Sequence, residues 1–268
     1  MTLSPSRLVV AMAAVLGLAA SAVAQAHTHY VRYEAAGRTS WGILDGETVR
    51  EVQGSIFDGA AKPSGRTVKV SDVKLLPPAD PKKVIAAGFN YKSHIGEQSP
   101  AKYVGLFAKF PSSLVGHNAD IIYPADATDL HYEAEVCVVM GKRARNITAA
   151  QVREHIFGVA PCNDVSERGW QKAIGPIGPA VVANVDYNRL KLIGRHNGRV
   201  VQETTTDLLI FSIDDIISAT SRYITLEPGD VIFTGTPGTT RAMKPGDTFE
   251  VEIPGVGTLK NTVVAEKR

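Results

Sequence analysis

The sequence predicts a mainly β fold with some α structure. Short Val- and Ile-rich stretches recur along the chain, Pro-Gly turns separate many of them, and few stretches carry helix signals. Because the strand-like stretches do not alternate regularly with helices, the pattern fits a mixed β core or roll better than an alternating βαβ sheet.

Composition limits the classes of protein that the chain can belong to. Of its 268 residues, 44% are hydrophobic and 21% are charged, which is enough apolar material for one good-sized core or for a small domain beside a larger one. The formal net charge is only +2 and there is no basic run. A chain so nearly neutral gives no electrostatic reason to expect a nucleic acid or an anionic membrane as its partner.

Residues 1–26 have the pattern of a secretory signal peptide. Arg7 is followed by an apolar run from Leu8 to about Val23, which closes on the small-x-small sequence Ala24-Gln25-Ala26. A permanent membrane span is the alternative, and the shortness and Ala content of the run argue against it. We therefore expect a mature chain that begins at His27, is periplasmic or secreted, and keeps no stable membrane anchor.

The next segment, residues 27–78, is predicted to be a small β domain. Its strand-like stretches are divided by turn signals such as Ala36-Gly37 and Asp45-Gly46, and the Pro-rich stretch 75–81 has the composition of a linker. The predicted strands are 28–34, 39–45, 47–52 and 66–76.

Residues 79–268 form the predicted catalytic domain. Helices are expected at 148–155, with Thr148 as N-cap, and at 212–221, with Asp214 and Asp215 in the first turn. A helical turn is expected after Asp164. The main predicted strands are 82–90, 131–139, 157–165, 230–238 and 247–264.

Two glutamates lie in an otherwise apolar strand. Glu133 and Glu135 are two residues apart, so in a strand their side chains point to the same face, which Cys137 continues. Like charges this close repel each other. A Mg²⁺ or Mn²⁺ ion, which typically binds two or three carboxylates as its ligands, would remove this repulsion. Asp164, which follows another apolar stretch, supplies a third acid. The alternative is a solvated strand face with ordinary surface glutamates.

The chain has only two cysteines, Cys137 and Cys162, so it is not a disulfide scaffold. We interpret them as two buried small hydrophobic residues. If their strands are neighbours, they can instead form one disulfide in an oxidising compartment.

Four motifs resemble those of the fumarylacetoacetate hydrolase family, in the order of that family, from about Thr28 to Val264. They are NYKSHIGE (90–97), YEAEVCVVMGK (132–142), NDVSERGWQ (163–171) and GDVIFTGTP (229–237). The resemblance implies a mixed β-roll with a small N-terminal β domain, usually paired as a homodimer. It also implies a divalent metal, Mg²⁺ or Mn²⁺, held by Glu133, Glu135 and Asp164.

The activity implied by the resemblance is cleavage of a C–C bond in a small 2-oxo acid or 1,3-diketo acid, by hydrolysis or decarboxylation, through a metal-stabilised enolate. An isomerase or tautomerase of an oxo-dicarboxylate is the nearest alternative. A non-catalytic periplasmic protein that binds metal and carboxylates is an alternative of another class.

Catalysis is assigned by the same resemblance to His94 and Glu97. An imidazole suits general-base work near neutral pH, and a glutamate three residues on can orient it within one helical turn. We expect the pair to favour hydrolysis or decarboxylation over isomerisation.

Candidate substrate contacts come from several motifs. Arg168 suits a carboxylate because its guanidinium group binds carboxylates in a bidentate fork. The full set of candidates is Tyr91, Lys109, Arg168, Gln171 and Thr236.

The chain departs from the family pattern after Gln171, where a segment that carries a lysine in many relatives is missing. Lys172 can stand in for that lysine only if its spacing allows it. His131 occupies a position where the family usually has an aspartate. The alternatives are that it changes the contacts around the metal ligands, that it adds a ligand, or that it is a simple surface exchange, which we favour.

Overall fold

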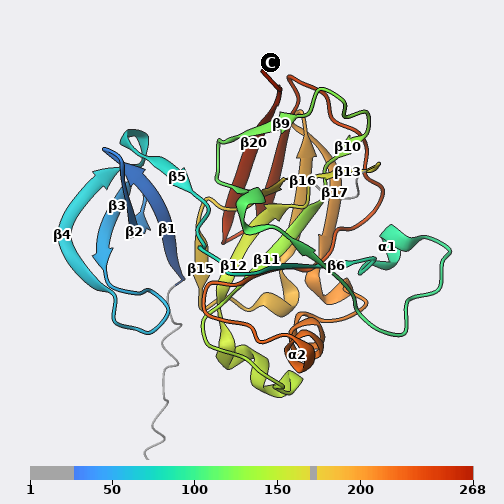
Figure 1. Cartoon of the computed structure of the whole chain (residues 1–268), viewed down its shortest axis with the longest axis horizontal. Coiled ribbons are helices and arrows are strands. Elements are labelled where there is room, and N and C mark those ends of the chain that lie inside the picture. The colour runs from blue at the N-terminus through green and yellow to red at the C-terminus, as the bar shows by residue number, and fades with distance from the viewer. Residues whose placement is uncertain (1–26, 170–173, 268) are drawn as a thin grey trace, which may run out of the picture.

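The computed structural model describes residues 27–169 and 174–267. Its strands form one long sheet, one five-stranded sheet and two short strand pairs, and only a few short helices lie around them (Figure 1). The prediction of a mainly β chain with a few helices is therefore confirmed. In this part of the chain, no helix combines the length and the apolar character that a membrane crossing needs.

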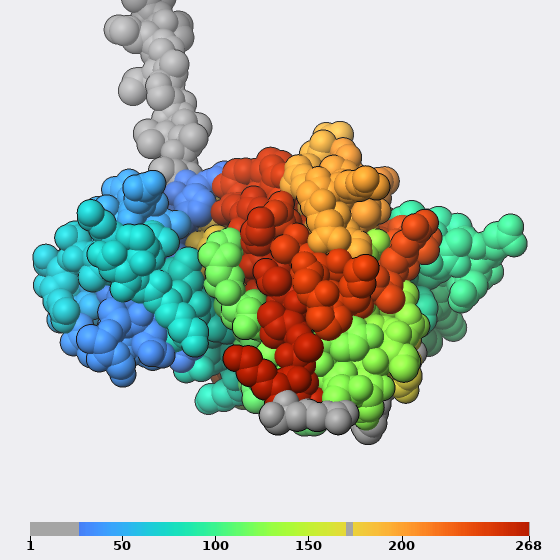
Figure 2. Space-filling model, turned by 90° about the horizontal axis from the view of Figure 1, so that it is seen from above, coloured from blue at the N-terminus to red at the C-terminus, as the bar shows by residue number. Residues whose placement is uncertain are grey.

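The N-terminal strands form an antiparallel meander, seen as a separate lobe at one end of the molecule (Figures 1 and 2). A two-residue turn joins the first two strands, and both of its residues, Ala36 and Gly37, have positive φ (49° and 74°), as a tight hairpin turn with right-handed strand twist requires. The strands are β1 (Thr28–Ala35), β2 (Arg38–Asp45), β3 (Thr48–Gln53), β4 (Lys62–Lys69) and β5 (Lys74–Leu76).

This meander continues into the long sheet, because β1 pairs with β15 through Thr28, His29 and Tyr30. The order of strands is β4-β3-β2-β1-β15-β12-β11-β18-β6-β7. The strands beyond the meander are β6 (Val84–Gly88), β7 (Gly105–Lys109), β11 (Ala134–Met140), β12 (Ile156–Asn163), β15 (Val181–Ala183) and β18 (Val231–Phe233).

A second sheet has the order β17-β16-β19-β20-β9. Its strands are β9 (Asp120–Tyr123), β16 (Lys191–His196), β17 (Arg199–Thr205), β19 (Thr248–Ile253) and β20 (Gly257–Ala265). Apolar side chains of β19 and β20 belong to the same buried cluster as Val136, Val138 and Met140 of β11. The two sheets therefore enclose the main core, as in a β-roll.

Strand β11 is buried on both faces, and its alternate residues pack into two different hydrophobic clusters. Val136 and Val138 enter the main core, whereas Cys137 and Val139 enter a second cluster on the opposite side. Because a strand alternates its side chains with period two, Glu135 lies on the face of Cys137. The prediction of a shared face for these two side chains is confirmed.

The predicted strand from His131 to Val139 is divided in the structure. Leu130 and His131 form β10 and pair with β13 (Ser166–Glu167), whereas β11 begins only at Ala134. Tyr132 and Glu133 lie at the break, where the chain passes from one partner strand to another. A further short pair joins β8 (Leu114–Val115) and β14 (Gly175–Pro176) in parallel.

The helices are short and lie at the edges of the sheets. Helix α2 (Ile213–Tyr223) confirms the prediction, since the Ser212 side chain accepts the Asp215 N–H and the Asp215 carboxylate accepts the Ser212 N–H in a capping box. The predicted helix at 148–155 is a 3₁₀ helix, η3 (Ala149–His155), that follows Thr148. The remaining helices are η1 (Val70–Asp72), α1 (Lys92–Ile95), η2 (Pro111–Ser113), η4 (Tyr187–Arg189) and η5 (Thr206–Leu208).

The helical turn predicted after Asp164 is not formed where the structure describes this segment. Ser166 and Glu167 are in β13, because their backbone pairs with β10. Residues 170–173, which include Gln171 and Lys172, lie outside the described residues.

Asn90 connects its own segment, after β6, to the chain around Phe211 and to the chain around Thr234. Its side-chain amide donates to the carbonyl oxygens of Phe211 (3.0 Å) and Thr234 (2.8 Å), and its amide oxygen accepts the Phe211 N–H (2.8 Å). Asn90 and Thr234 are buried, so the Thr234 carbonyl oxygen has no water to replace the amide, whereas the Phe211 groups are partly buried.

We expect Asn90→Ala to lower the free energy of unfolding by about 2–4 kcal/mol, because it leaves buried backbone groups without partners. Urea denaturation of the mature chain measures this loss. Asn188→Ala, at an exposed position, is the matched control and should change stability by less than about 0.5 kcal/mol. Equal stability of the two variants would contradict this role of Asn90.

Candidate metal centre and active site

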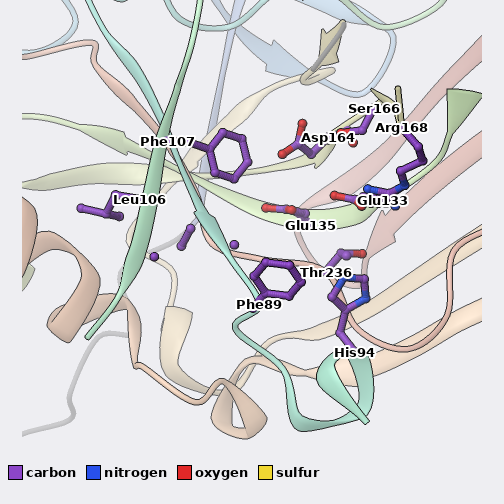
Figure 3. A pocket seen from close by; sticks show the side chains of 13 residues that line it. Phe89, His94, Leu106, Phe107, Glu133, Glu135, Asp164, Ser166, Arg168 and Thr236 are labelled. Atoms are coloured by element: carbon purple, nitrogen blue, oxygen red, sulfur yellow. Dashed lines mark hydrogen bonds and ion pairs between the residues drawn. The ribbon is translucent and has the colours of Figure 1, made fainter. Parts of the chain in front are cut away.

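Three buried carboxylates meet where β11 begins and β12 ends. Glu133, Glu135 and Asp164 each offer an oxygen, and these oxygens lie within 4.8 Å of one another (Figure 3). Antiparallel pairing brings them together, because Glu135 faces Cys162 in the register. The Asp164 N–H also donates to the Glu133 carbonyl oxygen (2.9 Å). The structure thus brings together all three acids that the sequence selected.

Two basic side chains and one backbone N–H contact the acids. Arg168 pairs with Glu133 (2.5 Å), and the buried ammonium group of Lys109 pairs with Asp164. The Gly235 N–H donates to Glu135 (2.7 Å). The sequence had indicated no cation beside the two glutamates, and tertiary structure supplies these two from distant segments.

These contacts do not remove the cost of burying the acids. Burial, followed by the Asp164 carboxylate, raises the pKa of Glu133 to about 7 although Arg168 opposes the shift. Burial and then the two neighbouring carboxylates raise the pKa of Glu135 well above its ordinary value. Without a further positive charge, the cluster therefore holds protons near neutral pH.

The donor set fits a hard divalent cation. Three carboxylates face two basic side chains, so the ionised cluster keeps an excess negative charge. Among the described residues, none bonds to the buried Oδ2 atom of Asp164. Mg²⁺ and Mn²⁺ prefer oxygen ligands of this kind, and such an ion would be held by Glu133, Glu135 and Asp164.

A cavity of about 330 Å³ opens onto the three acids. Its walls combine the acids with Arg168, Thr236 and His94 and with an apolar rim (Figure 3). The apolar rim consists of Phe89, Leu106 and Phe107, and no motif in the sequence indicated it. The exposure of Phe89 (67%) beside a buried strand shows that it serves the cavity mouth and not the core.

His94 points into this cavity with a defined tautomer. Its Nδ1 atom lies 2.6 Å from the Gly238 carbonyl oxygen. A carbonyl oxygen only accepts hydrogen bonds, so Nδ1 carries the proton and Nε2 of the neutral ring keeps its lone pair. The Gly238 N–H in turn donates to Ser93 (3.1 Å), which fixes α1 against the loop after β18.

The predicted His94–Glu97 pair is not formed. Glu97 is exposed and follows Gly96, whose backbone (φ 60°, ψ −123°) ends α1 before the two side chains come onto one helical face. Within the described residues, no hydrogen bond joins them. The Gly238 carbonyl takes the orienting role that was assigned to Glu97.

Tyr91 lies behind the cavity and is not among the residues that line it. Its side chain is buried, and its hydroxyl donates to the Thr205 carbonyl oxygen (3.4 Å). The expectation that Tyr91 lines the pocket is therefore wrong. Helix α1 begins directly after it, so its ring anchors the segment that carries His94.

Thr236 lines the cavity, but its hydroxyl is engaged in the fold. It donates to the Ala134 carbonyl oxygen (3.0 Å) and accepts the Gln202 amide (2.9 Å). In the described part of the chain, the Thr236 N–H has no acceptor, so this group is what Thr236 can offer to a ligand.

Arg168 is oriented by a chain of hydrogen bonds. It donates to the Thr240 hydroxyl (2.6 Å), which lies 2.8 Å from His131 Nδ1, and His131 Nε2 lies 2.8 Å from Asp129. His131 therefore contacts the network around the acids and is not simply a surface residue. It is not one of the three grouped candidate ligands.

The two cysteines form a disulfide between β11 and β12, with a Cα–Cα distance of 5.8 Å. Our interpretation of them as separate hydrophobic residues is wrong, and the alternative holds because their strands are neighbours. Each cysteine is two residues from a candidate ligand, Glu135 or Asp164. The covalent link thus lies directly beside the acid cluster.

The metal-free protein should lose stability as pH rises through about 7. The folded-state pKa values of Glu133 and Glu135 are raised, so the folded state binds more protons than the unfolded state above pH 4.5. Their contribution is present below that pH and falls as pH rises; for Glu133, whose folded-state pKa is about 7, it is on the order of 3 kcal/mol and is lost by about pH 8. Urea denaturation between pH 5 and 8 measures the change.

Glu135→Gln should flatten this pH dependence and make the metal-free protein more stable at pH 8, whereas Glu154→Gln, at an exposed site, should do neither. Identical pH profiles for wild type and Glu135→Gln would contradict the burial of an ionising group there.

Removing the disulfide should lower the free energy of unfolding by about 3 kcal/mol, because its loop spans 25 residues and the link restricts the unfolded chain. Urea denaturation of the Cys137→Ala/Cys162→Ala variant tests this. A thiol assay in urea without reductant should find no free thiol in the wild type. Detection of two thiols would refute the bond.

Comparison with known proteins follows the same division of the chain. Residues 83–264 match the family described as "Fumarylacetoacetate (FAA) hydrolase C-terminal", and residues 28–78 match the one described as "Rv2993c-like, N-terminal". The first match alone covers more than half of the chain.

Relatives and solved structures agree with this assignment. The chain is 37% identical to Protein Rv2993c of Mycobacterium tuberculosis, over 82% of this chain and 92% of the relative. It is 36% identical to the human mitochondrial oxaloacetate tautomerase FAHD2B, over 72% of this chain and 70% of the relative.

Among solved structures, the 2-hydroxyhepta-2,4-diene-1,7-dioate isomerase of Mycobacterium marinum superposes with a TM-score of 0.83. The superposition covers 90% of this chain and all of that chain, at 33% identity. The expected β-roll of this fold type is thereby confirmed. Sequence, fold and comparisons agree that this chain belongs to the fumarylacetoacetate hydrolase family.

Proposed function

We propose that the protein is a divalent-metal-dependent enzyme that interconverts the keto and enol forms of a small 2-oxo dicarboxylic acid of the oxaloacetate type. One observation carries the proposal: three buried carboxylates, with an unpartnered oxygen on Asp164, share a cavity with a guanidinium group and a tautomerically defined imidazole. Mg²⁺ and Mn²⁺ are both suitable ions.

The bound ion supplies Lewis acidity, which favours the enolate form of an adjacent 2-oxo acid. Arg168 supplies a site for a substrate carboxylate, because its guanidinium group lines the cavity beside Glu133. The Thr236 N–H is a second donor, and Gln171 is a third candidate donor from the segment outside the described residues. The cavity volume of about 330 Å³ suits a small acid.

His94 acts as the general base in this proposal. Its Nε2 lone pair is free to remove a proton from the carbon between the two carbonyl groups, while Nδ1 stays bonded to Gly238. Tautomerisation needs one base that takes a proton from the carbon and delivers it to the carbonyl oxygen, or carries it in the reverse direction. It needs no activated water. Since no carboxylate of the described residues hydrogen-bonds to His94, the geometry favours this reaction over hydrolysis, which we had linked to a His94–Glu97 pair.

Two relatives support the same reaction class. The human protein at 36% identity is named an oxaloacetate tautomerase, and the M. marinum protein at 33% identity is named an isomerase of an unsaturated dicarboxylate. Cleavage of a C–C bond is the second candidate. In an acylpyruvate, the His94 imidazole would instead deprotonate a water that attacks the distal carbonyl, and the C–C bond would break to release an enolate. In oxaloacetate, loss of CO₂ would leave an enolate of the same kind and needs no water.

The test follows enol-oxaloacetate by its ultraviolet absorbance and pyruvate by a coupled assay, with Mn²⁺ or Mg²⁺ present. We expect the enol signal to decay without pyruvate formation. His94→Gln should lower kcat by about 100-fold or more and leave the metal Kd unchanged. The matched control Glu97→Gln should retain wild-type kcat, because Glu97 is exposed and makes no contact with the imidazole.

If pyruvate were released at the rate at which the enol decays, the activity would be decarboxylation and not tautomerisation. Release of pyruvate from acylpyruvates would favour hydrolysis. Tight metal and oxalate binding with no turnover of any of these acids would favour a non-catalytic binding protein.

We further propose a homodimer. Strand β7 ends the long sheet with one edge unpaired by any described strand, and apolar side chains along it and beside it are exposed, among them Tyr103 (73%) and Phe110 (81%). Analytical ultracentrifugation of the mature chain should give twice the monomer mass. A monomer at micromolar concentration would contradict the proposal.

Export to an oxidising compartment is also proposed, with the signal-like residues 1–26 and the Cys137–Cys162 disulfide as its support. Cell fractionation followed by N-terminal sequencing should recover a periplasmic or secreted chain that starts at His27. Recovery of a full-length cytosolic chain would overturn it.

A further inference from the structure

A second cavity, of about 820 Å³, lies outside the candidate active site. It is lined mainly by polar and basic side chains from three segments: the β16–β17 hairpin, the chain between β10 and β11, and the loop after β18. The lining residues are Tyr132, His196, Asn197, Arg199, Val201, Thr239 and Arg241.

The hairpin places two of these side chains side by side. Asn197 and Gly198 have positive φ (50° and 76°) and form a two-residue turn, so His196 and Arg199 pair directly across the strands. Neighbouring side chains on such a pair lie close together on one face. The turn thus fixes a basic group at the cavity wall.

The opposite wall brings in a second guanidinium group. A β-bridge joins Ala242 to His131, so the adjacent residues Arg241 and Tyr132 reach the same cavity. In the ranges that the structure describes, neither Arg199 nor Arg241 has an ion pair. The nearby acid, Asp247, lies 3.0 Å from His196 Nε2 and accepts a hydrogen bond from the Asn197 side-chain amide (2.9 Å).

Tyr132 supplies a hydroxyl group to the cavity wall. Only 1% of the residue is exposed, because its ring stacks on Phe249 at a centroid distance of 4.5 Å. Its side chain nevertheless lines the cavity, and none of the described residues hydrogen-bonds to its hydroxyl. The hydroxyl is therefore available to donate to an oxygen of a ligand.

We propose that this cavity is a binding site for a small dianion with carboxylate or phosphate oxygens, held by Arg199, Arg241 and the Tyr132 hydroxyl. The charge and the donors agree with this class: two guanidinium groups that have no ion pair with any described acid, a phenol O–H and a Thr239 hydroxyl line one space. The site is distinct from the acid cluster, whose own guanidinium group is that of Arg168.

The loop between the two cavities gives this position a link to the active site. Residues 236–242 present Thr239 and Arg241 to the anion cavity, and the same loop holds His94 through Gly238 and Arg168 through Thr240. An anion bound on one side therefore contacts the segment that orients the candidate catalytic groups on the other side.

The test uses isothermal titration calorimetry of the mature chain, freed of metal with a chelating resin, at constant ionic strength. Inorganic phosphate and succinate are titrated separately, so that the two arms distinguish a phosphate from a dicarboxylate ligand. At least one of the two anions should give measurable binding at anion concentrations up to ~20 mM. Arg241→Ala should weaken that binding by about tenfold, and Tyr132→Phe, which keeps the stacked ring, by several-fold.

Two variants serve as controls. Arg222→Ala removes one positive charge at an exposed position away from the cavity, and Arg168→Ala removes the guanidinium group of the acid cluster. Both should bind the anion within about twofold of the wild type.

Loss of binding in Arg168→Ala with unchanged binding in Arg241→Ala would place the anion in the active-site cavity and overturn the proposal. Equal weakening by Arg222→Ala and Arg241→Ala would reduce the effect to net charge and also overturn it. No binding of either anion would have the same consequence. These outcomes are independent of the reaction proposed for the active site.

Discussion

Mutual repulsion among three buried carboxylates is the constraint around which the rest of this structure is arranged. Glu133, Glu135 and Asp164 are all buried and converge within 4.8 Å, so burial opposes their ionisation in addition to their mutual repulsion. The fold meets this cost with charge from two distant segments, through Lys109 and Arg168. One oxygen of Asp164 still has no partner among the described residues, and a divalent cation would satisfy both that atom and the remaining charge.

Rigid support for the cluster comes from the pairing of β11 with β12. Backbone hydrogen bonds set the register of the two strands, and the disulfide between Cys137 and Cys162 links them covalently one pleat away from the ligands. Both faces of β11 are packed, so the strand has no freedom to relax away from the repulsion. This stiffness is what a hard ion with strict coordination geometry needs.

The loop after β18 is the second organising element. Gly238 fixes the tautomer and direction of His94, Thr240 contacts Arg168, and Gly235 donates to Glu135. The same loop reaches the outer cavity through Arg241. The acids would therefore hold the ion, whereas this loop arranges the groups that would contact substrate.

Local sequence patterns gave the fold class and the three acids correctly. The alternation of apolar residues marked the strands, the two-residue spacing placed Glu135 on the face of Cys137, and Ser212 marked the start of α2. Each of these features depends on residues close in the chain. The pairing of His94 with Glu97, which the family resemblance implied and helical spacing was expected to allow, is not formed, because α1 ends at Gly96 after one turn.

The sequence by itself thus determined which residue types stand at which faces, since side-chain periodicity is a local property of the backbone. Only the tertiary structure decided the partners: Lys109 for Asp164, Gly238 for His94, and one cysteine for the other. These contacts join residues 25 to 144 positions apart, and strand order and register, not spacing, bring them into contact.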